Sequence, residues 1–374
     1  MTESKRRSVV SCVEEDRISN LQEYLIDSIL ERVPIEDAVR TSILSRKWRH
    51  TWTSMRALVF DGNFSYKFAV NGAFRRKGLI RIINQVLFLH NGPILKFHLH
   101  IPQISLDSFQ EVDQWMHFLS RNGVTEIVLT NSNQRYKLPC YMFCCRELRK
   151  LELENCLFKP PLEFEGFLNL EDLDLRKIDF GNNSSGTRIN LPKLKNLTIC
   201  KCTNVYNFQH QGYKSPEFGC PHWSRCQGLS HLPGIKDIHI DSIFLKCLFA
   251  ENIPKWLPHP VNSLKRLRLQ FFQEPRVDEG PALNHLKSSN CLDCTLNQLE
   301  LVEITDLQGS RPELLFIELL LAHSPSLQKF TIAPSGVSIA PSRVSDVKKR
   351  LDITIEVMQF SRASPKAKLF FVNS

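Results

Sequence analysis

The sequence predicts an α/β protein: a small N-terminal three-helix module, then an irregular repeat solenoid bent into an arc, then an α/β segment that caps it. Three observations predict this fold class. Helix signals and helix breaks alternate closely within residues 16–60. One short apolar pattern returns between residues 94 and 332, and a strand–helix–strand pattern begins near residue 299. The predicted divisions are a disordered basic tail (1–15), the helical module (16–60), a linker with the first solenoid elements (61–92), the repeats (93–298) and the C-terminal segment (299–374).

Composition agrees with a folded chain of more than one unit. The 374 residues exceed what one small core needs, and the apolar share of 42% is ordinary for a folded protein. The net charge of +9 is modest, so it does not by itself indicate a nucleic-acid partner.

The N-terminus predicts an intracellular protein. It contains no apolar signal-peptide region, and no run of about 18 apolar residues predicts a membrane span. The 12 cysteines are scattered, which favours free thiols in a reducing compartment. We therefore expect the nucleus or the cytoplasm or both, with Lys5-Arg6-Arg7 as a minimal nuclear signal.

The first predicted helix of the N-terminal module carries one apolar stripe. Asn20 and Glu23 have the spacing of a capping box, and Pro34 ends the helix. The apolar residues recurring at helical spacing are Leu25, Ile26, Ile29, Leu30 and Val33.

Two further helices complete the predicted module. Asp37 can cap the second, and Ser45 can cap the third, which carries Trp48 and Trp52 four residues apart on one face. Three helices in fewer than forty residues cannot bury much apolar surface alone. The module therefore needs a partner, or else it packs on the body of the protein, where a Trp-bearing helix is usually found.

The segments DRISNL and DAVRTSILSRKWRHTWTS resemble the F-box of plant F-box proteins. The resemblance implies a module that docks on a Skp-type adaptor and, through it, on cullin and RING subunits. The contact positions that it implies are Leu21, Leu25, Ile29, Leu44, Ser45 and Trp48.

One position departs from the F-box pattern. Where the family usually has Leu-Pro, this chain has Leu21-Gln22, and Gln22 lacks the ring that pre-sets the first helical turn. An alternative therefore stays open: a repeat scaffold for protein interactions, with a weakened F-box and no ligase role.

One pattern recurs in the body of the chain. It consists of an apolar residue, two residues of any kind, a second apolar residue, one residue of any kind and a third apolar residue. The starts at 148, 170 and 194 are 22 and 24 residues apart, the period of leucine-rich repeats. Other intervals reach 41 residues, so the array is irregular and carries insertions. The repeats start at Ile94, Val124, Leu148, Leu170, Leu194, Ile235, Leu264, Leu299 and Leu327.

Each repeat predicts a short strand whose two apolar side chains point into a shared core. The residues between them point to the concave side of the arc. Their signs change from acidic in the middle repeats to basic later, which favours an unknown protein substrate over a nucleic-acid groove; a solvated face without a partner is the alternative. The candidate substrate-facing residues are Glu152, Glu154, Asp172, Asp174, Arg176, Asp237, His239, Arg266 and Arg268.

A different period, typical of an amphipathic helix, appears between Leu106 and Asn122. It resembles the VDxW helix of plant F-box proteins with leucine-rich repeats. Its Trp115 is predicted to be buried packing rather than a ligand contact.

The C-terminal segment predicts a helix at Leu314–Ala322 and a strand at Leu327–Ile332. Two more strands are predicted at Ile353–Phe360 and Lys368–Val372. The segment is similar to the FBD domain that closes many plant F-box proteins with leucine-rich repeats, and it can cap the solenoid.

No sequence motif of a known catalytic class is present, so the prediction is a non-catalytic adaptor without cofactor or metal. The His and Cys residues between Cys220 and His231 suit zinc by type, but their spacing fits no common finger. We interpret that stretch as a loop, and the Cys291-x-x-Cys294 spacing as incidental.

Overall fold

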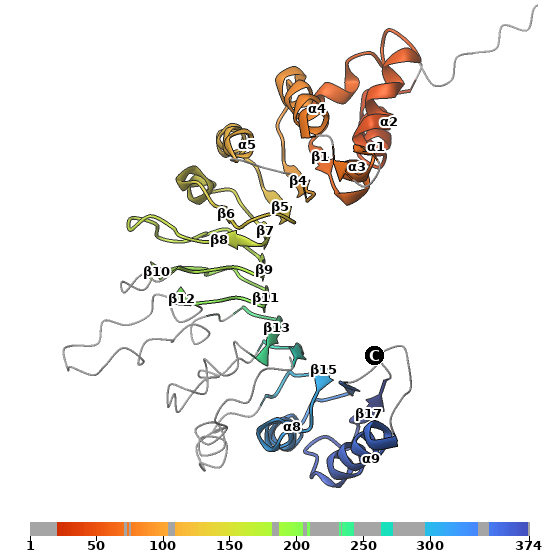
Figure 1. Ribbon diagram of the computed structural model, residues 1–374, viewed down its shortest axis with the longest axis vertical. Coiled ribbons are helices and arrows are strands. Elements are labelled where there is room, and N and C mark those ends of the chain that lie inside the picture. Colours follow the sequence, from red (N-terminus) through yellow and green to blue (C-terminus); the bar gives the residue numbers. More distant parts are fainter. Residues whose placement is uncertain are drawn as a thin grey trace, which may run out of the picture.

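A curved sheet of eleven parallel strands forms the body of the protein, with helices at both of its ends (Figure 1). The computed structural model describes residues 21–70, 73–74, 76–103, 109–181, 187–204, 208–209, 232, 234–242, 263–271, 296–335 and 344–372. The predicted basic tail, Asn20, the Cys220–His231 cluster and Cys291-x-x-Cys294 lie outside these residues.

The strands of the sheet follow one another in chain order, and every neighbouring pair is parallel. All nine predicted repeats form strands of this sheet, but its first strand, β1, was missed because it lies inside the predicted helical module. The strands are β1 (Ala57–Phe60), β4 (Lys96–Ile101), β5 (Glu126–Asn131), β7 (Lys150–Glu154), β9 (Asp172–Arg176), β11 (Asn196–Cys200), β13 (Asp237–Asp241), β14 (Arg266–Gln270), β15 (Leu301–Leu307), β16 (Lys329–Pro334) and β17 (Lys368–Phe371).

Shorter strands also form pairs, and those between residues 136 and 209 lie on the outer side of the arc (Figure 1). The pairs are β2 (Ala69–Val70) with β3 (Ala73–Phe74), β6 (Tyr136–Lys137) with β8 (Cys156–Leu157), and β10 (Thr187–Arg188) with β12 (Phe208–Gln209).

The register of the sheet stacks equivalent apolar residues into buried columns. Leu151 is the register partner of Leu173, which is the partner of Leu197, and all three are buried. Burying one such side chain contributes about 1.5–3 kcal/mol. No repeat can bury this face alone, so each strand depends on its neighbours.

A left-handed residue directly after the strand recurs along the sheet. Asn155, Lys177 and Lys201 follow β7, β9 and β11 with φ of 57°, 53° and 55°. The amides of Asn155 and Lys177 donate to the carbonyls of Arg176 and Cys200, both at 2.9 Å, and the amide of Lys201 donates to the Asp241 carboxylate. The left-handed backbone turns the chain away from the strand, and these hydrogen bonds offset the energetic cost of that conformation.

The N-terminal module contains α1 (Glu23–Leu30), α2 (Ile35–Arg40) and two 3₁₀ turns, η1 (Thr41–Ile43) and η2 (Thr51–Ser54). Two expectations were wrong. Asp37 does not cap the second helix, because that helix already begins after Pro34; Asp37 lies inside it and pairs with Arg40 at 2.9 Å.

The expected third α-helix is a run of turns that ends in η2. The hydroxyl groups of Thr51, Thr53 and Ser54 donate to nearby backbone carbonyls. Such local bonds compete with the helical ladder, which explains why Trp spacing alone misled the prediction. The Ser45 hydroxyl does accept from the Trp48 amide, at 3.4 Å.

Two helices, α4 (Arg76–Leu89) and α5 (Gln110–Ser120), lie on the outer side of the first strands (Figure 1). The short helix α3 (Gly62–Tyr66) contacts β1 and β4, and η3 (Cys140–Cys144) contacts α5. The α5 helix confirms the predicted amphipathic helix. Trp115 is buried, and its Nε1–H donates to Asn84 Oδ1 of α4 at 2.7 Å. The prediction that Trp115 is packing is confirmed.

The C-terminal end contains α8 (Arg311–His323) and α9 (Val344–Gln359) around β16 and β17. Ser310 and Glu313 form a capping box at the start of α8. The predicted helix at Leu314–Ala322 and the strands at Leu327–Ile332 and Lys368–Val372 are confirmed.

The strand predicted at Ile353–Phe360 is wrong, since these residues belong to the end of α9 and the turn after it. Ile353 and Val357, four residues apart, are buried on one helical face, whereas Ile355 and Met358 are exposed. The β-branched residues of this segment imitate a strand, but burial follows the helical period.

Candidate functional site

The α1 helix is apolar on two faces, and only one of them is buried. Ile26 and Leu30 are fully buried, whereas Leu25 and Ile29 remain 38% and 44% exposed. Elsewhere in the module, Leu44 is 56% exposed. The single stripe expected from the sequence is therefore divided between the core and an outer face.

Five large apolar residues of the module are exposed, and we call them the exposed apolar set: Tyr24, Leu25, Ile29, Ile43 and Leu44. Sequence reasoning missed Tyr24 and Ile43, although both lie beside predicted contact positions. Exposed apolar residues gathered on one small module mark a surface for a protein partner.

The other predicted adaptor contacts lie deeper. Trp48 is only 3% exposed and belongs to the hydrophobic core, together with Trp52. Leu21 is half-buried, and its carbonyl accepts a hydrogen bond from the Lys47 ammonium group. In this conformation Leu25, Ile29 and Leu44 are thus the predicted contact residues that offer apolar surface, and their role stays a prediction.

Gln22 precedes α1 with φ −67° and ψ 147°, and its side chain makes no capping hydrogen bond. Its carbonyl accepts from the amides of Leu25 and Ile26 at 3.0 and 3.2 Å. Proline also has a carbonyl and a φ near −65°, so it fits this backbone.

We expect Gln22→Pro to raise the free energy of unfolding by about 0.4–1 kcal/mol, because proline restricts the unfolded chain. Urea denaturation beside wild type measures this change. A loss of stability would show that the Gln22 amide or side chain makes a contact that proline removes.

The middle of the concave face carries charges that neutralise one another. Lys150 Nζ lies 2.8 Å from Glu152 and 3.5 Å from Glu126, a residue that sequence reasoning missed. Arg176 donates two hydrogen bonds to Asp174, at 2.9 and 2.8 Å. These partly exposed pairs contribute little stability each, but they fix the pattern of charge on the face.

Asp237 lies on the same face as Arg266 and Arg268, but its side chain is covered. Asp237 is 6% exposed, with Arg266 Nε at 2.8 Å and Arg268 Nη2 at 3.3 Å from its carboxylate. Arg266 and Arg268 of β14 cover the carboxylate of Asp237 on β13. The sequence pattern of a single strand does not reveal such a contact between strands. The surface offered at this point is therefore that of the two arginines.

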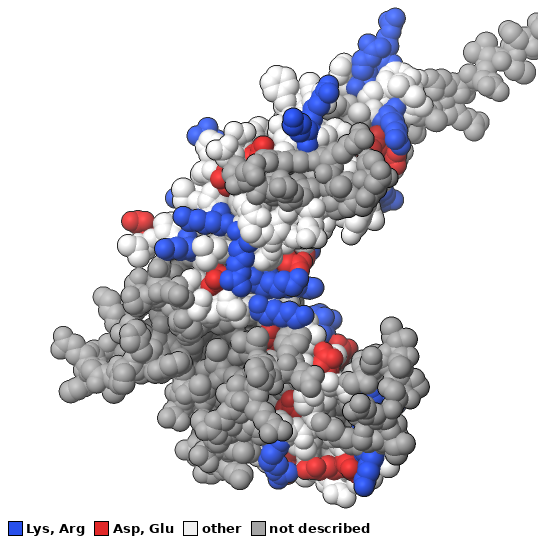
Figure 2. Space-filling model, viewed as in Figure 1, with Lys and Arg blue, Asp and Glu red and all other residues white. Residues whose placement is uncertain are grey.

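Other predicted face residues retain exposure. Lys177 of the turn after β9 reaches Glu154 at 2.7 Å. Asp172 accepts a hydrogen bond from Asn196 of β11. Figure 2 shows the same mixture of signs, with Lys and Arg next to Asp and Glu over the middle of the arc.

Three histidines of the face, His98, His100 and His239, lie in surroundings that favour their neutral form. Burial lowers the pKa of His98, His100 and His239, and the nearby Lys96 and Arg268 charges lower the pKa of His98 and His239 further. His98 and His100 were not among the predicted face residues. They offer hydrogen bonds to a partner and no positive charge.

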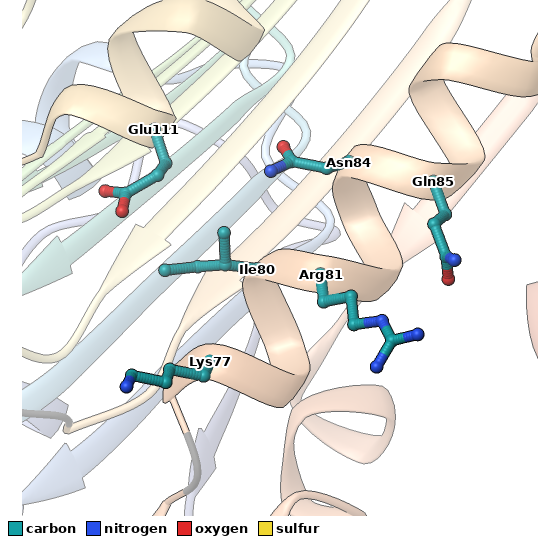
Figure 3. Close-up of a pocket in the computed structure, with 6 residues that line it drawn as sticks. All are labelled: Lys77, Ile80, Arg81, Asn84, Gln85 and Glu111. Carbon is teal, nitrogen blue, oxygen red and sulfur yellow. The ribbon is translucent and has the colours of Figure 1, made fainter.

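A pocket of about 500 Å³ lies between α4 and α5 (Figure 3). Glu111 comes from α5, and the other five residues that Figure 3 labels come from α4. The Asn84 amide there holds the indole of Trp115. The described lining combines the Glu111 carboxylate with two basic side chains, Lys77 and Arg81, and two side-chain amides, Asn84 and Gln85.

Two of the described cysteines, Cys200 and Cys202, are buried free thiols. Burial raises the pKa of Cys200 and Cys202 to about 12, so both thiols stay protonated and are poor nucleophiles at neutral pH. In the part of the chain that the structure describes, no three His, Cys, Asp or Glu side chains group as metal ligands would. No described helix has the length and apolar character that a membrane crossing requires.

Comparison with known domain families assigns three segments. Residues 18–59 match the F-box domain, residues 86–209 match the leucine-rich-repeat domain described as At1g61320/AtMIF1, and residues 287–332 match the FBD. The FBD match ends at β16, so α9 and β17 lie beyond it. F-box domains generally bind Skp-type adaptors.

Curated relatives agree with these domains. The chain is similar to the F-box/FBD/LRR-repeat protein At1g13570 of Arabidopsis thaliana, with 30% identity over 96% of this chain and 98% of that protein. It is also similar to the putative FBD-associated F-box protein At1g61330 of the same plant, with 24% identity over 69% of this chain and 57% of that protein.

A third relative, the Arabidopsis F-box/FBD/LRR-repeat protein At5g56420, is 23% identical over 68% of this chain and 65% of its own length. Proteins with F-box and leucine-rich-repeat domains are generally non-catalytic adaptors. The near-complete coverage of the first relative, the three domain matches and the curved parallel sheet lead to one conclusion: this chain belongs to the plant F-box/FBD/LRR-repeat family.

Proposed function

We propose that this protein is the substrate-recognition subunit of an SCF-type (Skp–cullin–F-box) ubiquitin ligase. The observation that carries the proposal is the exposed apolar set on an F-box module whose opposite face is buried in the core of the sheet. A module anchored in this way presents its free apolar face to a second protein.

The concave face is the proposed substrate site. The F-box holds the adaptor, with cullin and RING subunits beyond it, and the repeats form an irregular solenoid that holds the substrate, with the FBD segment at its end. Ubiquitin transfer then becomes a proximity effect, since one frame holds both reactants and raises their effective concentration. No side chain of this chain needs to act in the chemistry, and the working compartment is the nucleus, the cytoplasm or both.

The direct test is co-elution of the purified full chain with a Skp-type adaptor on a sizing column. We expect wild type to co-elute with the adaptor, and Gln22→Pro to bind at least as tightly, because a pre-set first turn lowers the ordering cost of binding. If neither protein binds although both are folded, the ligase proposal is wrong.

The alternative function, a repeat scaffold with a weakened F-box, rests on Gln22. It gives a different result in the same experiment: wild type fails to bind and Gln22→Pro restores binding. The backbone at Gln22 already has the φ that proline would impose, which favours the ligase proposal over this alternative.

A further inference from the structure

A groove of about 1080 Å³ lies at the amino-terminal ends of the last four strands, β14 to β17. Lys265, Lys329, Lys366 and Lys368 line it, and Glu300 is the one carboxylate among the described lining residues. Because parallel strands begin at the same edge of a sheet, residues up to about a hundred positions apart meet there.

The groove carries positive charge that the described residues leave uncompensated. Glu300 lies 3.4 Å from Lys265. Within the described residues, no carboxylate lies within ion-pair distance of Lys329, Lys366 or Lys368. This differs from the middle of the concave face, where the charges are paired across strands.

Two of these lysines are held next to each other. Lys329 and Lys368 are register partners on β16 and β17, so their backbones are about 4.8 Å apart. Like charges directly opposite on neighbouring strands repel. A bound anion relieves this repulsion, whereas a cation increases it.

Phe370 adds an apolar contact to the charge. Its side chain is 42% exposed in the groove, and Lys329 Nζ lies 5.5 Å from the centre of its ring. A ligand with acidic groups and an apolar or backbone surface between them can use both features.

Three side-chain amides also line the groove: Asn297, Gln298 and Gln328. An amide both donates and accepts, which matches the alternating N–H and C=O groups of an extended peptide. Nucleic-acid strands are bound by arginine and stacked aromatics, and the described lining contains one aromatic ring and no arginine.

We propose that this groove binds an acidic segment of the substrate protein, with Asp or Glu carboxylates facing Lys329, Lys366 and Lys368. The inference rests on the proposed substrate-recognition function and adds the chemical class of the segment that is recognised.

The test is fluorescence anisotropy with the full chain and a labelled peptide of alternating Glu, Ser, Asp and Gly, about twelve residues or 40 Å long when extended. The comparison probes are the same peptide with Lys in place of the acids and a single-stranded RNA of equal length. The groove variant is Lys329→Glu/Lys368→Glu. Its control is Lys137→Glu/Lys159→Glu, which makes the same change in net charge at exposed positions outside the groove.

We expect wild type to bind the acidic peptide, the groove variant to bind it at least about tenfold more weakly, and the control to stay within about twofold. The Lys peptide should not bind. Circular dichroism of both variants detects a folding defect. Co-elution of both variants with the Skp-type adaptor tests the ligase proposal, so its failure is distinguished from a failure of this inference. Lys329→Gln/Lys368→Gln replaces the groove variant if charge reversal prevents folding.

Two results overturn the inference. One is peptide binding that the control weakens as much as the groove variant does, which would show only non-specific attraction to a basic protein. The other is tighter binding of the RNA than of the acidic peptide, with loss of RNA binding in the groove variant, which would assign the groove to nucleic acid.

Discussion

Replacing Ile29 and Leu44 together by Glu is expected to weaken binding to a Skp-type adaptor by at least about 100-fold, equivalent to about 2.7 kcal/mol. Both side chains are exposed, so the folded chain tolerates the carboxylates. In the complex the same carboxylates would be buried in an apolar interface without a partner, which is costly. Isothermal titration of the folded variant with the adaptor measures the change.

Leu162→Glu is the matched control for this double variant. Leu162 is 88% exposed and lies far along the chain from the F-box, between β8 and β9. It should leave adaptor affinity unchanged within about twofold, since surface substitutions away from an interface have small effects. Equal loss in the control and the double variant would mean that the exposed apolar set is not the docking surface.

Trp48→Ala is expected to lower the free energy of unfolding by about 3–5 kcal/mol, the cost of a large cavity. Trp48 is only 3% exposed and belongs to the hydrophobic core, so its truncation leaves a buried cavity. Such a change is a large fraction of the total stability of a typical domain. Chemical denaturation followed by far-ultraviolet circular dichroism measures it.

Ile43→Ala serves as the control for Trp48→Ala, because Ile43 is 87% exposed and its truncation leaves no cavity. We expect it to change stability by less than about 0.5 kcal/mol. If Trp48→Ala instead keeps wild-type stability but loses adaptor binding, Trp48 acts as a contact residue, as the F-box resemblance implied.

The repeat strands could be predicted because each repeat carries its own burial pattern. Leu151 and Leu153, Leu173 and Leu175 alternate with polar residues, and the parallel register places them in common buried columns. Long-range pairing between equivalent units follows from the period alone. The first strand, β1, carries the same pattern as Met55-x-x-Leu58-x-Phe60 and was missed because it lies inside the predicted helical module.

The ends of the chain were harder to predict because several local signals compete there. Turns stand where the third helix of the module was expected, because Thr and Ser hydroxyl groups there donate hydrogen bonds to backbone carbonyls. At α9, β-branched residues suggested a strand, and only burial on one face, at Ile353 and Val357, identifies a helix.

The candidate sites depend on pairing between distant segments. Asp237 is covered by arginines about thirty residues later in the chain, and the two lysines of β16 and β17 become neighbours only through the register. The packing of other segments against Ile26 and Leu30 likewise determines which apolar residues of α1 remain exposed. Spacing within one element does not contain this information.

The most direct test of adaptor docking is hydrogen–deuterium exchange of the full wild-type chain with and without a purified Skp-type adaptor. The proposal predicts slower exchange in residues 23–50, which hold the exposed apolar set, and unchanged exchange in the strands β7, β9 and β11. Slower exchange in those strands with none in residues 23–50, or no change anywhere at saturating adaptor, would contradict it.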